Sequence, residues 1–479
     1  MSRILTAVAF LWLVSSIAVA APERSAEAFV HYWNAGDDRA AINSEVFTDD
    51  FIARRGEEGL AQMMRMVYGD NGDIAVHSIT RATGDSVRFL VSSEKGNWLD
   101  IGLDLAGDGR IGAFGVQFTT PPPVGSEQGL DGSEIAKRVR DYVDGLAEKG
   151  AFSGAVLLAK DFEPVLAKSY GLADRETGRA NTLDTPINLG SMNKMFTGLA
   201  ITQLVAEGKL AYDDPVGKYL PDYPNQRVRD TVSIHQLLTH TSGLGSYWNA
   251  RYDERKNTLQ SLDDFAALFV DDPLAFEPGE AEQYSNAGPV VLGLIIKSVS
   301  GQDYYAFIRE RVYSPAGMDN SGHFDKFENQ SGKANGYYVP EGGSEPISNF
   351  DDLGRIGSAA GGGYASANDL LRFARALYDG TLIDAEHREI MTTFKVPWGA
   401  EGGYGYLFAD LRINGQRFIG HNGGAPGINA EFSHFPELGY TLIVLSNLDR
   451  AATPVADQVR TWIGYSNSSG APREAASTD

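Results

Sequence analysis

The feature that most constrains the fold is that strand-like patterns occur at both ends of a long region whose middle is helical and rich in loops. Short apolar runs bounded by turn residues predict strands at the following segments: 154–160, 164–170, 417–421, 429–435 and 440–446. Helical patterns precede the first strand and follow the last one. We therefore expect one antiparallel sheet made from both ends of the region, flanked by the terminal helices, with the middle folded as a helical lobe. The cleft between lobe and sheet is the expected place for a binding site.

This region, residues 133–464, is the larger of two domains expected in a chain of 479 residues. A linker at residues 121–132 begins with three consecutive prolines, which cannot continue a helix or a sheet. Before it, residues 21–120 carry two helical patterns followed by alternating strand patterns. This order resembles the NTF2-like or cystatin-like cone. We expect an α+β fold in both domains and a polar, disordered tail at residues 465–479.

The first twenty residues have the composition of a cleaved signal peptide. Arg3 supplies positive charge, residues 4–14 form an apolar run, and the Ala-Val-Ala sequence at residues 18–20 matches a cleavage site. An uncleaved membrane anchor is the alternative, but two serines interrupt the run and no stop-transfer charges follow. We expect the mature chain to begin at Ala21, to have no stable membrane span, and to be periplasmic or secreted.

Composition argues against several classes of protein. A net charge of −22 and the lack of a Lys/Arg cluster argue against nucleic-acid binding, because such a surface repels phosphate. The absence of cysteine excludes disulfides, thiolate metal sites and a Cys nucleophile. Since the sequence has no metal-ligand spacing and no glycine-rich phosphate loop, we expect neither a metal nor a cofactor. It also has no G-x-S-x-G segment, which argues against an α/β-hydrolase.

Ser191 and Lys194 form the first of three short motifs that together suit acyl transfer. An apolar helical pattern begins at Ser191, so Lys194 lies on the same face with Cβ atoms about 5–6 Å apart. A lysine there can stabilise the serine alkoxide or, if desolvated, act as its base. A serine at a helix start is also often only an N-cap. The same pattern recurs at Ser92 and Lys95 in a predicted hairpin, where the two side chains need not meet.

The second motif is Tyr-Ser-Asn at residues 284–286, where a loop enters an apolar helix. The pKa of a phenol is about 10 in water, and a nearby ammonium lowers it. Tyr284 near Lys194 is therefore suited to take the serine proton and to pass it to the leaving group. Asn286 offers an amide donor and an acceptor to a substrate amide. The alternative is ordinary packing, and the tripeptide recurs at residues 465–467 beside the polar tail.

The third motif is His421-Asn422-Gly423-Gly424, which follows a predicted strand. Its glycines let a substrate approach the backbone closely. The backbone N–H groups of Gly424 and Ser191 together suit the binding of an oxyanion. The alternative is a glycine-rich strand end with a surface histidine.

Four ring-bearing residues of the helical middle carry weaker signals. His235 and His240 flank a short helix and are interpreted as structural residues that bond backbone carbonyls. Tyr247 and Trp248 follow them and are candidates to line the cleft, with ordinary packing as an equal alternative.

The three motifs in this order resemble the serine β-lactamase-like and penicillin-binding family, in its branch of class C β-lactamases, DD-peptidases, D-aminopeptidases and esterases. The Leu-Leu-Thr-His-Thr-Ser-Gly-Leu segment at residues 237–244 and the glycines at residues 361–363 add to the likeness. The likeness covers residues 133–464. It implies a β-lactamase/transpeptidase-like fold, with an antiparallel sheet flanked by helices plus a helical lobe.

The resemblance also implies roles for the motif residues. Ser191 is the implied acylated nucleophile, and Lys194 and Tyr284 are the implied groups that activate it and move its proton. Asn286 is implied to hold the substrate amide, and the backbone of Ser191 and Gly424 to form the oxyanion hole.

His421 and Gly423 stand where class A enzymes have the lysine and glycine of K-T-G. A histidine has an ordinary pKa of about 6.5 and is mostly neutral at pH 7. It therefore holds a substrate carboxylate less well than a lysine, which argues against efficient β-lactam hydrolysis.

The leading hypothesis is an exported serine hydrolase that acts on a small-molecule or peptide ester or amide through a serine acyl-enzyme. The alternative is a non-catalytic binding or sensing protein that retains the penicillin-binding fold. A third hypothesis is a scaffold whose N-terminal domain recruits a partner protein that the sequence does not identify.

Overall fold

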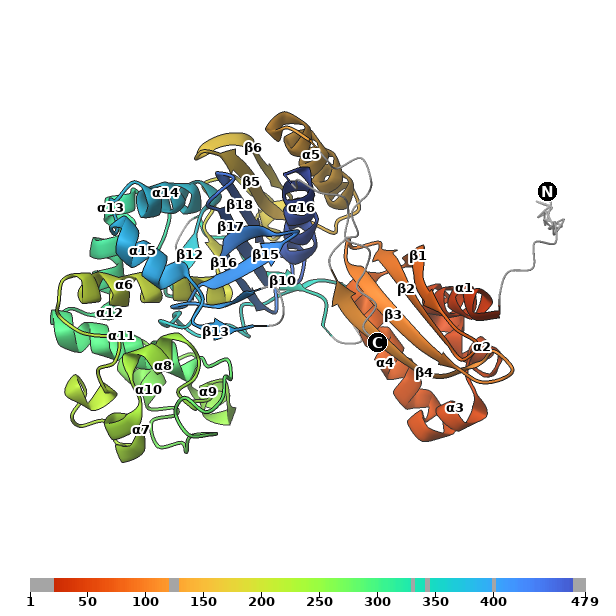
Figure 1. Ribbon diagram of the computed structural model, residues 1–479, viewed down its shortest axis with the longest axis horizontal. Helices are drawn as coiled ribbons and strands as arrows, with labels where there is room; N and C mark the ends of the chain where they lie inside the picture. The colour runs from red at the N-terminus through yellow and green to blue at the C-terminus, as the bar shows by residue number, and fades with distance from the viewer. Residues whose placement is uncertain (1–20, 120–128, 329–331, 341–344, 399–401, 468–479) are drawn as a thin grey trace. The chain divides into compact units, whose positions relative to one another are not determined.

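The computed structural model describes residues 21–119, 129–328, 332–340, 345–398 and 402–467. It divides into two compact units, Met1–Thr119 and Thr120–Asp479 (Figure 1). The expected signal peptide, residues 121–128 of the expected linker, and the expected tail from residue 468 onward lie outside the described residues.

In the first unit, helices precede a four-stranded antiparallel sheet with strand order β1-β2-β3-β4. The elements are α1 (Ala21–Asn34), η1 (Gly36–Asp38), α2 (Arg39–Val46), α3 (Asp49–Arg55), α4 (Glu57–Asn71), β1 (Ile74–Ala82), β2 (Ser86–Ser93), β3 (Trp98–Leu105) and β4 (Ile111–Thr119). The aromatic face of α1, with Phe29, Tyr32 and Trp33, is buried against the sheet. The sequence analysis missed α2 and α3, which are too short to show a clear helical period.

The second unit is built on an eight-stranded antiparallel sheet with the order β13-β14-β15-β16-β17-β18-β5-β6. Its strands are β5 (Gly154–Lys160), β6 (Glu163–Tyr170), β13 (Val396–Pro397), β14 (Gly402–Tyr404), β15 (Ala409–Ile413), β16 (Gln416–Ala425), β17 (Ile428–Phe435) and β18 (Tyr440–Ser446). β18 pairs with β5, for example Ile443 with Leu157. Both ends of the region therefore meet in one sheet, and the predicted α+β class is confirmed.

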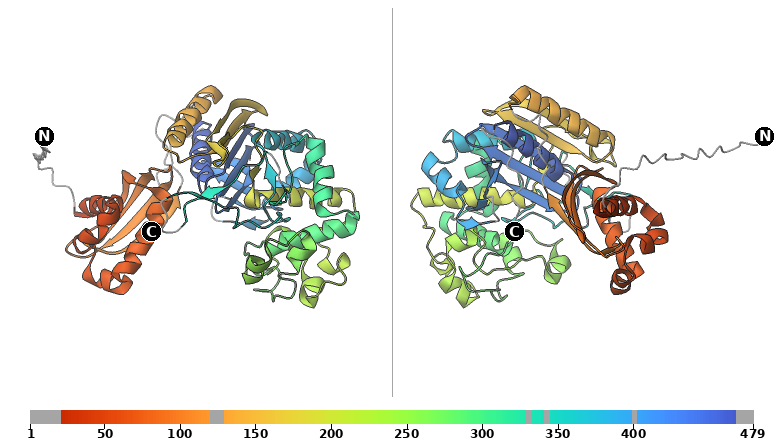
Figure 2. Two further views of the ribbon diagram at one scale, coloured as in Figure 1. Left: turned by 180° about the vertical axis from the view of Figure 1, so that it is seen from behind. Right: turned by 45° about the vertical axis from the view of Figure 1, so that its right-hand side comes forward.

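The sheet of the second unit is covered on both faces. Successive strand residues point to opposite faces, so Val156 and Leu158 of β5 pack with α5 (Gly132–Glu148) and α16 (Ala452–Ser466). Leu157, between them, belongs instead to the core shared with the lobe helices. Figures 1 and 2 show α5 and α16 together on one side of the sheet and the lobe on the other. This explains why β17 and β18 are buried along their whole length.

The middle of the chain forms the helical lobe. Its helices are α6 (Lys194–Ala206), α7 (Gln226–Thr231), α8 (Ile234–Leu238), α9 (Ala250–Arg255), α10 (Leu262–Ala266), α11 (Ala287–Ser300), α12 (Tyr304–Ile308), α13 (Ser314–Ala316), α14 (Ala367–Tyr378) and α15 (Ala385–Thr392). Shorter elements are β7 (Leu172–Asp174), β8 (Arg179–Ala180), β9 (Ile187–Asn188), η2 (Gly190–Asn193), η3 (Val216–Lys218), η4 (Arg309–Tyr313), β10 (Tyr337–Tyr338), β11 (Ile347–Ser348) and β12 (Tyr364–Ala365). α6 and α11 are buried along most of their length, as expected for helices that are apolar all round.

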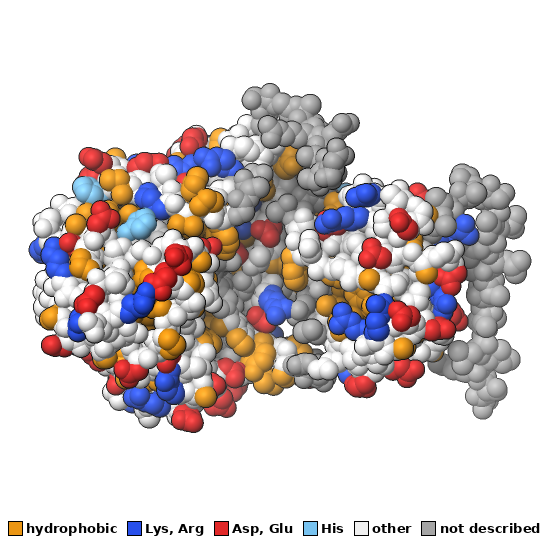
Figure 3. All heavy atoms as spheres, turned by 60° about the horizontal axis from the view of Figure 1, so that its bottom comes forward, with side chains coloured by type: hydrophobic (Ala, Val, Ile, Leu, Met, Phe, Trp, Pro, Cys, Tyr) orange, Lys and Arg blue, Asp and Glu red, His pale blue; other side chains and the backbone are white. Residues whose placement is uncertain are grey.

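The surface carries both signs of charge. Figure 3 shows Asp and Glu side chains mixed with Lys and Arg side chains on the face of the second unit that it presents. Over the described part of the chain, no helix is both long enough and apolar enough to cross a membrane.

A buried ion cluster ties α16 to β17. The guanidinium of Arg460 donates to Glu431 at 2.6 Å and to Asp457 at 2.9 Å. The side chains of Arg460 and Glu431 are only 12% and 2% exposed. Because water reaches neither group freely, each charge depends on the other for its stabilisation.

We expect Arg460→Met to lower the free energy of unfolding of the second unit by about 3–5 kcal/mol, since it leaves the buried Glu431 carboxylate without its cation. Urea unfolding followed by tryptophan fluorescence measures the change. Arg227→Met is the matched control, because the ion pair of Arg227 with Glu277 is more than half exposed and contributes little. Equal effects of the two substitutions would contradict this assignment.

Candidate active site

Ser191 and Lys194 are brought together by a tight turn. The sequence analysis expected a helix from Ser191, but the structure has the 3-10 turn η2 over Gly190–Asn193, and α6 begins only at Lys194. Side chains three residues apart eclipse one another in a 3-10 turn. Lys194 Nζ accordingly lies 3.1 Å from Ser191 Oγ.

The amine of Lys194 is fully buried among uncharged oxygens. Besides Ser191, it lies 2.8 Å from Asn286 Oδ1 and 2.6 Å from the backbone oxygen of Ala360. None of these three partners carries a charge. Burial therefore lowers the pKa of Lys194 well below its usual 10.5, because a desolvated ammonium is unfavourable without a counter-ion.

The three contacts of Lys194 also fit an unprotonated amine. A neutral amine has two N–H groups and one lone pair. The oxygens of Asn286 and Ala360 can only accept hydrogen bonds, so they take the two N–H groups. The lone pair is then left for the hydroxyl of Ser191, which is the arrangement of a base and the proton that it removes.

Tyr284 contacts both of these residues. Its ring centroid lies 4.7 Å from Lys194 Nζ. The residue exposes 40% of its surface, yet desolvation raises the pKa of its phenol and a hydrogen bond with Ser191 only partly opposes the rise. The sequence analysis expected the pKa of Tyr284 to be lowered, which is wrong. The lysine faces the ring, and burial favours its neutral form, so no ammonium stabilises a phenolate.

The third motif lies inside β16 rather than after it. β15 pairs with β16 only as far as Gly420, and the segment Leu189–Ser191 lies against the following residues. A β-carbon on Gly423 would overlap the carbonyl oxygen of Leu189 and come within 2.9 Å of the backbone nitrogen of Ser191. Glycine at this position therefore allows β16 to approach the backbone of Ser191.

His421 is a buried residue, with 6% of its surface exposed, and so it does not fit the alternative of a surface histidine. Its Nδ1 lies against the backbone oxygen of Asn422, and its Nε2 lies 2.8 Å from the hydroxyl of Tyr404. Burial, with a smaller contribution from Lys194, lowers the pKa of His421 to about 3. The imidazole is therefore neutral, in agreement with the sequence analysis.

His235 and His240, the two histidines of the helical middle, have different hydrogen-bond partners from those expected. His235 Nδ1 lies 3.1 Å from the hydroxyl of Tyr406, and His240 Nδ1 accepts the backbone N–H of Ser285 at 3.2 Å. The prediction that their rings bond backbone carbonyls is therefore wrong.

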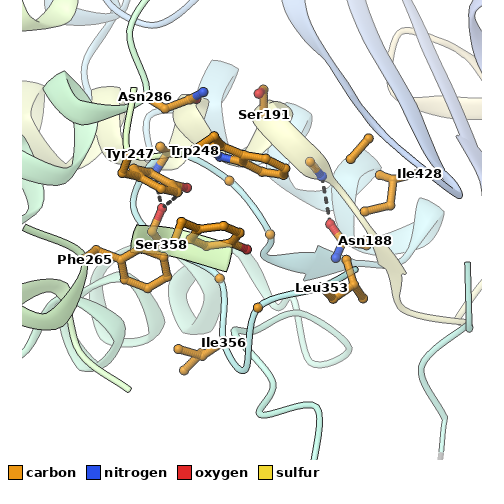
Figure 4. Close-up of a pocket in the computed structure, with 18 of the residues that line it drawn as sticks. Asn188, Ser191, Tyr247, Trp248, Phe265, Asn286, Leu353, Ile356, Ser358 and Ile428 are labelled. Atoms are coloured by element: carbon orange, nitrogen blue, oxygen red, sulfur yellow. Dashed lines mark hydrogen bonds between the residues drawn. The ribbon is translucent and has the colours of Figure 1, made fainter. Parts of the chain in front are cut away.

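A pocket of about 350 Å³ opens beside Ser191 (Figure 4). Four of the seven predicted site residues line it, namely Ser191, Tyr284, Asn286 and Gly424. The other three, Lys194, His421 and Gly423, are buried next to it.

The remaining wall of the pocket is mainly apolar and aromatic. It includes Tyr247, Trp248, Tyr252, Phe265, Phe324, Leu353, Ile356, Tyr364 and Ile428. Figure 4 shows the rings of Tyr247, Trp248 and Phe265 around one part of the cavity. The sequence suggested only Tyr247 and Trp248, because the others occur in segments that read as ordinary core or loop.

Polar groups in this wall form hydrogen bonds with other residues of the protein. The Tyr247 hydroxyl and Ser358 Oγ lie 3.0 Å apart. Asn188 Oδ1 accepts the backbone N–H of Gly190 at 2.9 Å. Lys326 Nζ donates to the backbone oxygens of Phe350 and Leu353 at 3.0 and 2.7 Å.

Neither of the two recurring motif copies lines this pocket. Lys95 donates to the backbone of Gly69 rather than to Ser92. Ser466 and Asn467 bond the backbone of their own helix, α16. Over the described residues, no group of His, Asp and Glu side chains is arranged to bind a metal ion.

Residues 136–462 match the family model for beta-lactamases. The chain belongs to the beta-lactamase family. The sequence resemblance is thereby confirmed, and so is the fold that it implied for the second unit.

Three relatives illustrate the range of this family. Penicillin-binding protein 4* of Bacillus subtilis is 31% identical over 330 residues, which cover 65% of this chain and 71% of the relative. Esterase EstB of Burkholderia gladioli is 32% identical over 328 residues, which cover 59% of this chain and 81% of the relative. A crystal structure of a penicillin-binding protein from Bacillus halodurans matches with a TM-score of 0.60 and 31% identity, covering 66% of this chain and 97% of that one.

Gly423→Ala tests the close approach of β16 to Ser191. We expect it to lower the free energy of unfolding by about 1–3 kcal/mol, because the added methyl group forces the backbone at Leu189 to move. Thermal unfolding measures the change. Gly424→Ala is the matched control, because a β-carbon there meets nothing closer than the Ile428 oxygen at 3.8 Å. The packing described here would be wrong if the control were destabilised as much.

Proposed function

We propose that this member of the beta-lactamase family is an exported serine hydrolase that cleaves a small ester or amide through an acyl-enzyme on Ser191. The observation that carries the proposal is the fully buried Lys194 amine, which lies 3.1 Å from Ser191 Oγ and whose other partners are uncharged oxygens. The signal-peptide pattern of residues 1–20 supports export.

In the proposed acylation, Lys194 Nζ removes the proton of Ser191 as Oγ attacks the substrate carbonyl carbon. The backbone N–H groups of Ser191 and Gly424 bind the resulting oxyanion. When the tetrahedral intermediate collapses, the phenol of Tyr284 gives its proton to the leaving oxygen or nitrogen and regains one from Lys194. Water then attacks the ester in the same way, which releases the acid and restores Ser191.

The raised pKa of Tyr284 supports a role as a proton donor in this scheme. A phenol that holds its proton at neutral pH is a donor rather than a base. Lys194 is therefore the base, and Tyr284 is the group that protonates the leaving atom.

The pocket supports an uncharged acyl group that is aromatic or branched. Its apolar walls stabilise such a group by excluding water from it. Lys326 is held by two backbone oxygens, and His421 is neutral. His421 therefore offers no charge to a substrate carboxylate, and two of the three N–H groups of Lys326 are already used. We therefore propose that carboxylate-bearing β-lactams and D-Ala-D-Ala peptides are poorer substrates than neutral esters and amides.

A turnover screen with Ser191→Ala as the control tests this function. We expect p-nitrophenyl phenylacetate to be cleaved about tenfold or more faster, in kcat/KM, than p-nitrophenyl acetate. N-Acetyl-phenylalanine amide, a neutral amide, is expected to be cleaved, and nitrocefin and D-Ala-D-Ala peptides are expected to turn over slowly. A fluorophosphonate should label the wild type and not Ser191→Ala. Equal labelling of the two proteins would favour the binding-protein alternative.

The pH dependence tests the assignment of Lys194 as the base. Only its unprotonated form can accept the serine proton, so kcat/KM rises with pH as the amine loses its proton. Because the pKa of Lys194 is lowered, we expect the plateau to be reached well below pH 10.5. Lys194→Arg should lower kcat by about 10²–10⁴-fold, because a guanidinium stays protonated. A rate that rises only above pH 10 would contradict the assignment.

A further inference from the structure

His240 is bonded to the chain on both sides of Tyr284. Its backbone oxygen accepts the N–H of Gln283 at 3.0 Å, and its ring Nδ1 accepts the N–H of Ser285 at 3.2 Å. One residue therefore holds the backbone N–H groups of the residues just before and just after Tyr284. Its ring also lies against the Tyr284 ring, with centroids 4.5 Å apart.

The same ring of His240 reaches toward the third motif. Its centroid lies 4.9 Å from that of Tyr404, whose hydroxyl contacts His421 Nε2 at 2.8 Å. A continuous series of rings thus runs from Tyr284 on the lobe to His421 on β16. This series of contacts connects the phenol with the strand that carries Gly424.

The position of His240 is unfavourable for a histidine in its backbone conformation and in its hydrogen bonding. It is 2% exposed, and its backbone has a φ of +60°, in the left-handed region that few side chains adopt. Because Nδ1 accepts a hydrogen bond, a neutral ring carries its proton on Nε2, and that atom has no partner among the described residues. A buried polar group without a partner lowers stability. Packing alone therefore gives no reason for a histidine here.

We propose that His240 is a positioning residue that holds the phenol of Tyr284 in line with Ser191 and Lys194. The inference rests on the proposed function, since it concerns the proton path of that reaction. The proposal requires the imidazole of His240 to be neutral, because a doubly protonated ring cannot accept the N–H of Ser285. Burial keeps the pKa of His240 well below 6.5.

Two substitutions separate the features of this histidine. His240→Asn tolerates the positive φ and offers an oxygen acceptor, but it lacks the ring. His240→Phe keeps a ring and lacks the acceptor. We expect each to lower kcat by about 10–100-fold, because small displacements of a reacting group have effects of this size, with KM within about twofold. His235→Asn is the matched control, since that ring contacts Tyr406 and not Tyr284, and it should leave kcat unchanged.

A double-mutant cycle with Tyr284→Phe gives the decisive comparison. If His240 acts through the phenol hydroxyl, adding His240→Asn or His240→Phe to Tyr284→Phe lowers kcat by no more than about twofold. A full further loss in that background would show that the histidine acts only on overall structure and would overturn the proposal. Unchanged kcat in both His240 variants would overturn it as well.

A measurement on the wild-type protein tests the proposal even if both variants fail to fold. Nitrogen NMR of histidine-labelled protein at pH 7 is expected to show His240 neutral, with its proton on Nε2. A doubly protonated His240, or a proton on Nδ1, would overturn the proposal. If wild-type protein cleaves no ester or amide, the proposed function fails. If the wild-type protein is active and the His240 variants have the same kcat, only the inference about His240 fails.

Discussion

The site depends on one physical constraint, the burial of the Lys194 amine among uncharged oxygens. Its partners come from three separate parts of the chain, at Ser191, Asn286 and Ala360. Desolvation without a counter-ion favours the free amine, and the two carbonyl oxygens orient its lone pair. The fold of the second unit matters for chemistry because it brings these three segments together and keeps carboxylates away from the amine.

The sheet positions the turn that carries Ser191. β15 stops pairing with β16 at Gly420, and the turn that carries Ser191 packs where a further strand would lie. The approach is close enough that only a glycine fits at position 423. Ser191 and Gly423, about 230 positions apart in the sequence, thus meet at one edge. The edge belongs to a sheet that is packed on both faces, which suits a site that must hold an oxyanion in a fixed position.

Sequence patterns predicted strands β5, β6, β16, β17 and β18 of the large sheet, the closing of the sheet by both ends of the chain, and the three motifs, but they missed the short strands β13, β14 and β15. These features depend on local periodicity and on residue types. The pKa direction of Tyr284 was predicted wrongly because it depends on burial and on which part of the ring Lys194 faces, and both are set by distant segments. The rings of Phe265 and Tyr252 in the pocket could not be found, because a pocket wall and a core have the same apolar pattern. The partners of His240 were likewise decided by a loop more than forty residues away.

The account is tested most directly by the protonation state of Lys194 in the resting protein. NMR titration of the protein with carbon-13 at lysine Cε, with Lys194→Met used to assign the resonance, measures it. We predict that the Lys194 amine loses its proton well below pH 10.5, the ordinary value for a lysine. A Lys194 that stays protonated up to pH 10 would contradict the central claim.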